Sequence, residues 1–168
     1  MALNQALLME FDHEIAGVRK SLERVPYDKA DWRPHPKSWP LAALATHVAR
    51  IPGWAKETLT QDSLDMAAGD PSEFNKLAAS HSDLMAMFDK HAFAGRAAIA
   101  ATSDEEFMKP WSLKSGETVH FTMPKIAVLR GFVLSHVIHH RAQLGVYLRM
   151  LDVPVPALYG PSADEQGM

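Results

Sequence analysis

Apolar residues recur every three or four positions along several long stretches of the chain, which is the spacing of one face of an α-helix. The first such stretch predicts an amphipathic helix that ends before Pro26, since proline cannot continue a helix. Its apolar positions are Leu8, Phe11, Ile15, Val18, Leu22 and Val25.

A second helix is expected after a proline-containing loop at residues 27–39. Pro40 suits the first turn of this helix, and Ser38 just before it is a candidate cap. Pro52 is expected to kink the helix, because its ring removes a backbone donor and clashes with the turn before. The residues along one face are Leu44, His47, Ile51 and Trp54.

A third helix is expected to start at Ser72 and Glu73, after the turn residues Gly69-Asp70-Pro71, and to continue to about Ala101. Its apolar positions are Phe74, Leu77, Leu84 and Phe88. The helical pattern is then lost from residue 102 to residue 121. Two short segments flank the turn residues 114–117, so the sequence favours a small hairpin there.

The fourth helix is expected to begin near Met123 or Pro124. The three-four spacing continues through Ile126, Leu129, Val133, His136, His140, Gln143, Tyr147 and Leu151. Four amphipathic helices can bury their apolar faces only against one another. The predicted fold class is therefore all-α: a four-helix bundle with long loops, in one domain over residues 1–168, ending in an irregular tail at 152–168.

Composition narrows the chemistry that this bundle can perform. The chain has 168 residues with no cysteine, nine histidines and a net charge of −3. The lack of cysteine excludes disulfides, thiolate-bound zinc and iron–sulfur clusters, and the acidic balance argues against nucleic-acid binding. We see no signal peptide and no membrane-length apolar run, so a cytoplasmic protein without membrane contact is expected.

Two of the nine histidines share the apolar face of the fourth helix. His136 and His140 are four residues apart and lie one turn from each other. An unpaired polar group in a core costs about 1–3 kcal/mol, and a divalent cation would take up the lone pairs of both rings. His139 is the alternative partner of His136, but it lies off the apolar face, so the pair 136/140 is favoured and His139 is left as a candidate to support a ligand ring.

A third ligand must come from another helix, and His47, between Leu44 and Ile51, is the candidate. His81 and His91 are alternatives, but they lie about 15 Å apart along one helix and cannot share an ion. Gln143 is placed to orient a ligand ring or to make a packing hydrogen bond. Other expectations are a surface ion pair for Arg141, loop-anchoring or pocket-wall roles for Trp32 and Trp39, an exposed His13, and loop positions for His35 and His120.

Three segments carry a resemblance to the DinB/YfiT-like superfamily, and the similarity extends over nearly the whole chain, with the helices in the expected order. The segments are Asp31–Ser38, Leu44–Ala49 and His136–Leu144. The resemblance implies a four-helix bundle that holds one divalent metal, zinc or nickel, through His47, His136 and His140. It also implies a homodimer, and activities such as S-transfer from low-molecular-weight thiols (bacillithiol, mycothiol, glutathione) or maleylpyruvate isomerisation. Ala142 stands where that family often has glycine.

Three imidazole ligands would leave one coordination position open to a small molecule. A thiol bound there would be deprotonated, and it would have to come from a cosubstrate because the chain has no cysteine. The expected function is metal-dependent activation of a small thiol for transfer to a small electrophile. The alternatives are a non-catalytic metal-binding bundle in stress response or protein interaction, and purely structural histidines. Metal release is expected below about pH 6, as imidazoles protonate.

Overall fold

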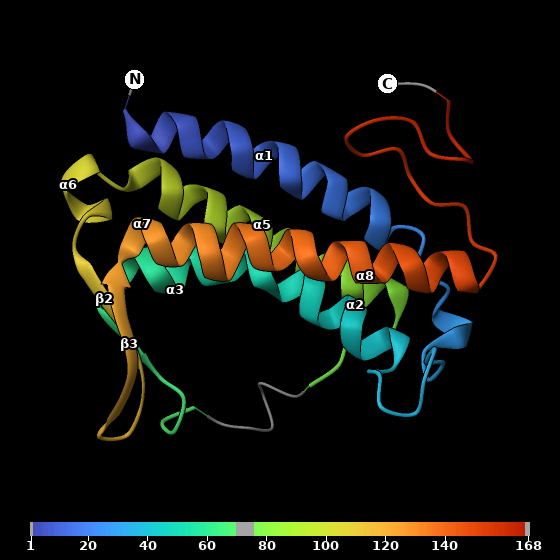
Figure 1. The fold of residues 1–168 in the computed structure, drawn as a ribbon, viewed down its shortest axis with the longest axis horizontal. Coiled ribbons are helices and arrows are strands. Elements are labelled where there is room, and N and C mark those ends of the chain that lie inside the picture. The colour runs from blue at the N-terminus through green and yellow to red at the C-terminus, as the bar shows by residue number, and fades with distance from the viewer. Residues whose placement is uncertain (1, 70–75, 167–168) are drawn as a thin grey trace.

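Four helical rods make up most of the computed structural model, which describes residues 2–69 and 76–166 (Figure 1). The rods are α1 (Leu3–Leu22), α2 (Leu41–Arg50) with α3 (Trp54–Thr60), α5 (His81–Ala101), and α7 (Lys125–Val128) running through a π-helical segment (Leu129–Ser135) into α8 (His136–Met150). Among the described residues, no helix has the length and apolar character needed to cross a membrane.

The second rod breaks where proline was expected to disturb it. Residues Ile51–Gly53, which include Pro52, form a 3₁₀ turn between α2 and α3. Gly53 is required here, because a Cβ at this position would overlap the ring of His91 on α5. The expected cap at Ser38 is wrong: no side chain caps α2, and Pro40 directly precedes its first residue.

The third rod begins at His81, capped by the Ser80 hydroxyl, which accepts a hydrogen bond from the Asp83 backbone N–H. The predicted start at 72–73, with Phe74, lies outside the described residues. Leu77 precedes the helix and is exposed, so its place on the apolar face was predicted wrongly. The apolar spacing extends to Leu77, before the helix, whereas the helix itself starts at the capping residue Ser80.

A small sheet at one end of the bundle corrects the all-α prediction. The hairpin is confirmed as β2 (Pro110–Ser115) and β3 (Thr118–Pro124), with Gly116 in the turn at a φ of 57°. The strand β1 (Ser63–Asp65) adds parallel to β2 and was not predicted, nor was the short helix α6 (Asp104–Phe107). A three-residue strand has too little sequence pattern to predict when its partner lies about fifty residues away.

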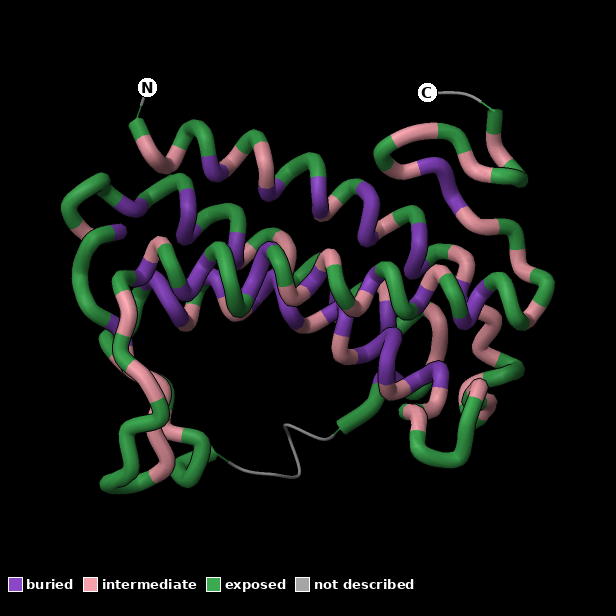
Figure 2. Tube along the Cα trace, in the orientation of Figure 1, coloured by how far each residue is buried: buried purple, intermediate pink, exposed green. Residues whose placement is uncertain are grey.

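The core lies between the four rods, on the faces that the apolar spacing predicts (Figure 2). Phe11, Val18 and Leu22 of α1 are fully buried, as are Leu44 of α2 and Leu144 of α8. Beyond α8 the described tail has no helix or strand, which confirms the prediction for those residues. Two tail carboxylates anchor it: Asp164 pairs with Arg149, and Glu165 with Arg24.

A buried ion pair joins the last helix to the first. Arg141 Nη1 lies 2.8 Å from Glu14 Oε2, and the two side chains are only 3% and 7% exposed. Tyr159 of the tail completes the network by donating to the same carboxylate at 2.7 Å and accepting from Arg141. The predicted surface ion pair for Arg141 is therefore wrong, because α1 and the tail cover this face of the helix.

Replacing Glu14 by alanine is expected to lower the free energy of unfolding by about 3–5 kcal/mol, because it leaves the charge of Arg141 buried without its counter-ion. Asp12→Ala is the matched control: Asp12 pairs with Arg96 at 2.8 Å with both side chains about half exposed, so the loss should be at most about 1 kcal/mol. Urea unfolding measures both variants. Equal losses would contradict the role assigned to the buried pair.

Candidate metal centre

Three histidine rings meet where α2 packs against α8. Ligand atoms of His47, His136 and His140 all lie within 4.8 Å of one another. The closest approach joins His47 Nε2 and His136 Nε2, which are 3.2 Å apart. The structure thus brings together the three residues that the sequence nominated, and each ring is partly buried.

The local fold explains why these rings face one another. His136 and His140 are one turn apart on α8, and their ring centroids are 4.7 Å apart. His47 meets them from α2, with its centroid 4.6 Å from that of His140. The π-helical segment ends directly before His136, and such segments are frequent at functional sites. The three-four spacing runs unbroken across this segment, so the pattern of apolar residues does not indicate it.

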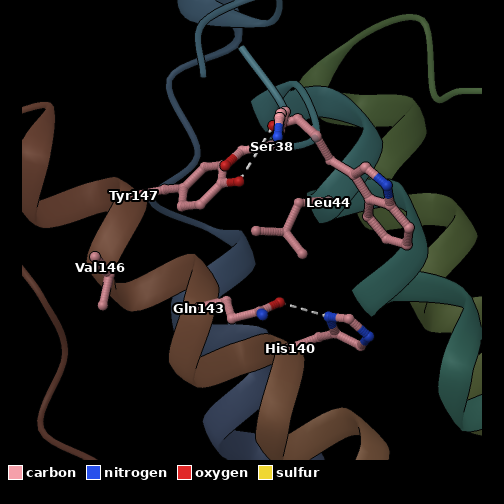
Figure 3. Close-up of a pocket in the computed structure, with 8 residues that line it drawn as sticks. Ser38, Leu44, His140, Gln143, Val146 and Tyr147 are labelled. Carbon is pink, nitrogen blue, oxygen red and sulfur yellow. Dashed lines mark hydrogen bonds between the residues drawn. The ribbon is translucent and has the colours of Figure 1, made fainter. Parts of the chain in front are cut away.

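Gln143 forms a hydrogen bond with the ring of His140 (Figure 3). Its Oε1 lies 2.7 Å from His140 Nδ1. Because an amide oxygen can only accept, this hydrogen bond places the proton on Nδ1 and leaves the Nε2 lone pair free for a ligand. His139 is exposed and lies outside the cluster.

Two tryptophans enclose the cluster. The Trp39 ring is stacked 5.7 Å from that of His140 and stands edge-on to His47 at 5.1 Å. Trp54 lies 5.5 Å from His47 and 5.2 Å from His136. Trp39 therefore forms a wall of the site, whereas Trp32 packs on Tyr147 and anchors the loop. The sequence placed Trp54 on the apolar face without indicating this role.

Each histidine of the cluster borders a different pocket. His140 lines one of about 380 Å³, shown in Figure 3. His47 lines one of about 810 Å³, and His136 one of about 450 Å³. Trp39 belongs to the first two and Trp54 to the last two. Small molecules can therefore approach the cluster from more than one side.

The electrostatics keep the three rings neutral. Burial, with the neighbouring His140 and His136, lowers the pKa of His47 to about 4. Burial also lowers the pKa of His136 and of His140. Neutral imidazole is the form that binds metals, and within the described ranges no carboxylate or thiol joins the cluster. A metal held by these rings would be released at a lower pH than the value of about 6 expected from an ordinary imidazole.

The other histidines lie elsewhere. His81, one of the alternatives, has its Nε2 3.1 Å from the backbone oxygen of Leu22. His91, the other, packs against Gly53, and burial lowers its pKa. It lines the same pocket as His47 but is not part of the three-histidine cluster. The remaining histidines are His13, His35 and His120, and all three are exposed.

The fold and the cluster define a helical bundle with a candidate three-histidine metal centre. The profile of the DinB family matches residues 2–167, so the chain belongs to the DinB family. A search of curated proteins gave no match.

Solved structures share the fold at low sequence identity. A DinB-like protein (YjoA) from Bacillus subtilis is 16% identical with a TM-score of 0.69, covering 97% of this chain and 99% of its own. One from Bacillus cereus is 18% identical with a TM-score of 0.69, covering 92% and 97%. YfiT from Bacillus subtilis, described as a probable metal-dependent hydrolase with an unusual four-helix bundle topology, is 15% identical with a TM-score of 0.64, covering 89% and 87%.

The metal-free protein is expected to lose stability as the pH falls from about 6.5, the ordinary imidazole pKa. Below that pH the three histidines are protonated in the unfolded chain but stay neutral in the folded cluster, until the pH nears the His47 pKa of about 4. The free energy of unfolding therefore falls with pH over this window. Urea unfolding with a chelator present measures it. His47→Gln should flatten the dependence and His139→Gln should not; an unchanged slope in His47→Gln would refute the expectation.

Proposed function

We propose that His47, His136 and His140 hold one divalent metal ion, zinc or nickel, and that the protein uses it to transfer a low-molecular-weight thiol to a small electrophile. The observation that carries this proposal is the convergence of three neutral imidazole rings beside open pockets. Three nitrogen ligands with an accessible side are the composition of catalytic rather than structural zinc sites.

The donor atoms present fit such an ion. Two Nε2 atoms 3.2 Å apart need either a proton or a cation between them, because their lone pairs otherwise repel. Gln143 accepts the Nδ1 proton of His140, so the remaining nitrogen of that ring is available as well. The lowered pKa values keep the rings free of competing protons at neutral pH.

When bound, the ion would supply the positive charge that lowers the pKa of a thiol beside it. The protein contains no cysteine, so the thiol must be a cosubstrate. Its proton passes to solvent, the sulfur forms a bond to the electrophilic carbon, and the leaving group departs with its bonding electrons. Trp39 and Trp54 contribute by shielding two sides of the cluster from water.

A second candidate is hydrolysis, which the description of YfiT as a probable metal-dependent hydrolase favours. The same centre would then lower the pKa of a water molecule in place of a thiol. A third reading is a metal-binding bundle without turnover, acting in stress response or through a protein partner. All three readings require the bound metal, and they differ in the product: a thioether, a hydrolysed ester, or neither.

The purified protein is expected to bind about one metal ion per chain, measured by elemental analysis and competition with a chelator. His140→Ala should lose this binding, whereas His139→Ala, its exposed neighbour, should keep it. Gln143→Leu should weaken the affinity roughly 10- to 100-fold, because it removes the group that orients His140. Equal effects of the changes at 139 and 140 would contradict the ligand assignment.

The metal-loaded protein is expected to form a thioether from chlorodinitrobenzene and at least one of glutathione, bacillithiol or mycothiol, followed by absorbance. His140→Ala should lower the rate by roughly 100-fold or more, and His139→Ala should stay within about twofold. Metal-dependent cleavage of nitrophenyl acetate without a thiol would favour hydrolysis instead. A bound metal with neither product would favour the non-catalytic reading.

A further inference from the structure

A pocket of about 450 Å³ lies between the small sheet and the helical bundle, and His136 forms part of its wall. Trp54, the neighbour of His136, belongs to α3 on one side of it, and Leu64 belongs to β1 on another. The strands that the sequence did not fully predict therefore build a cavity that opens onto the candidate metal centre. We call it the sheet pocket.

Apolar side chains line the sheet pocket and yet remain open to solvent. Leu64, Met66 and Phe132 are 42%, 56% and 40% exposed. Phe132 stacks on Phe121 with ring centroids 4.8 Å apart, so the surface is held in place by packing within the wall. Clustered apolar surface around a concave pocket is typical of a ligand-binding groove.

The wall also contains a polar group without a partner. Trp111 is 5% exposed, and among the described residues its Nε1–H has no hydrogen-bond acceptor. A buried donor left unpaired is costly, and such groups are uncommon in folded proteins. Its Nε1 has almost no accessible surface, so a ligand in the pocket does not reach it, and Trp111 contributes the apolar surface of its ring to the wall.

The charges around the sheet pocket select against anions. Its charged lining residues in the described part of the chain are Glu57 and Asp65, both acidic, with no lysine or arginine among them. Asp65 is compensated by Lys114, whose Nζ lies 3.8 Å away outside the lining, so Glu57 supplies the negative charge that a negatively charged ligand would meet after losing its hydration. An uncharged ligand with an aromatic or aliphatic body suits both the lining and the charge.

We propose that the sheet pocket binds the uncharged, aromatic or apolar body of the electrophilic acceptor and presents it beside His136. The identification of this ligand as the acceptor rests on the proposed function. The pockets beside His47 and His140 leave separate approaches for the thiol. The sulfur–carbon bond then forms between two molecules that reach the cluster from different sides.

Isothermal titration of the metal-free protein with naphthol tests the pocket without requiring metal or turnover. Naphthol should bind, and naphthalenesulfonate should bind at least about tenfold more weakly because of its charge. Leu64→Glu should weaken naphthol binding by about tenfold or more, and Met66→Glu, at a more exposed turn position, is the second variant. Val119→Glu introduces the same charge on the exposed face of β3, outside the pocket, and should leave binding unchanged.

The outcomes separate this inference from the proposed function. If Leu64→Glu or Met66→Glu weakens naphthol binding, the sheet pocket is supported. If the same protein shows no metal-dependent turnover, the transfer reaction is overturned while the pocket stands. The sheet pocket is overturned if naphthol does not bind or binds equally to all variants, while both variants keep turnover with an unchanged KM for an aromatic electrophile. The transfer reaction stands in that case. Preference for the sulfonate over naphthol also overturns it.

Discussion

The constraint on which the site depends is the close approach of three imidazole rings inside a helical bundle. Positive charge on all three rings is disfavoured, because the rings lie close enough to repel one another and partial burial adds to the penalty for charge. The bundle therefore holds three neutral donor groups whose lone pairs converge, at a cost in stability on acidification. Such an arrangement is favourable when a cation occupies it, since the cation satisfies all three rings together.

The neighbouring helix contacts serve this geometry. Arg141 follows His140 directly, and its buried pair with Glu14, closed by Tyr159, fixes α8 against α1 and the tail. Gln143 fixes the His140 ring itself, and Trp39 stacks on it. One short stretch of α8 thus carries a candidate ligand and the group that orients it on one face, and the ion pair that fixes the helix on another.

The small sheet gives the bundle a feature that four helices alone would lack. Leu64, Trp111 and Phe121 stand opposite the π-helical segment and leave a cavity that reaches His136. The exposed apolar side chains there do not contribute fully to folding, and the unpaired Trp111 donor opposes it. The exposed apolar side chains suit a cavity that adjoins the histidine cluster.

The sequence by itself determined the helical rods, the break at Pro52 and the pair His136/His140, because apolar spacing, proline chemistry and an i, i+4 pair are local properties of a helix. Turn residues indicated the hairpin, and His47 was nominated from its place on an apolar face and from the family resemblance. The tertiary structure decided the rest. Arg141 became buried because α1 and the tail cover it, β1 formed because β2 was there to pair with, and Trp54 became a wall of the site because α3 packs beside His136. Each of these depends on contacts between residues far apart in the chain, and no local pattern encodes them.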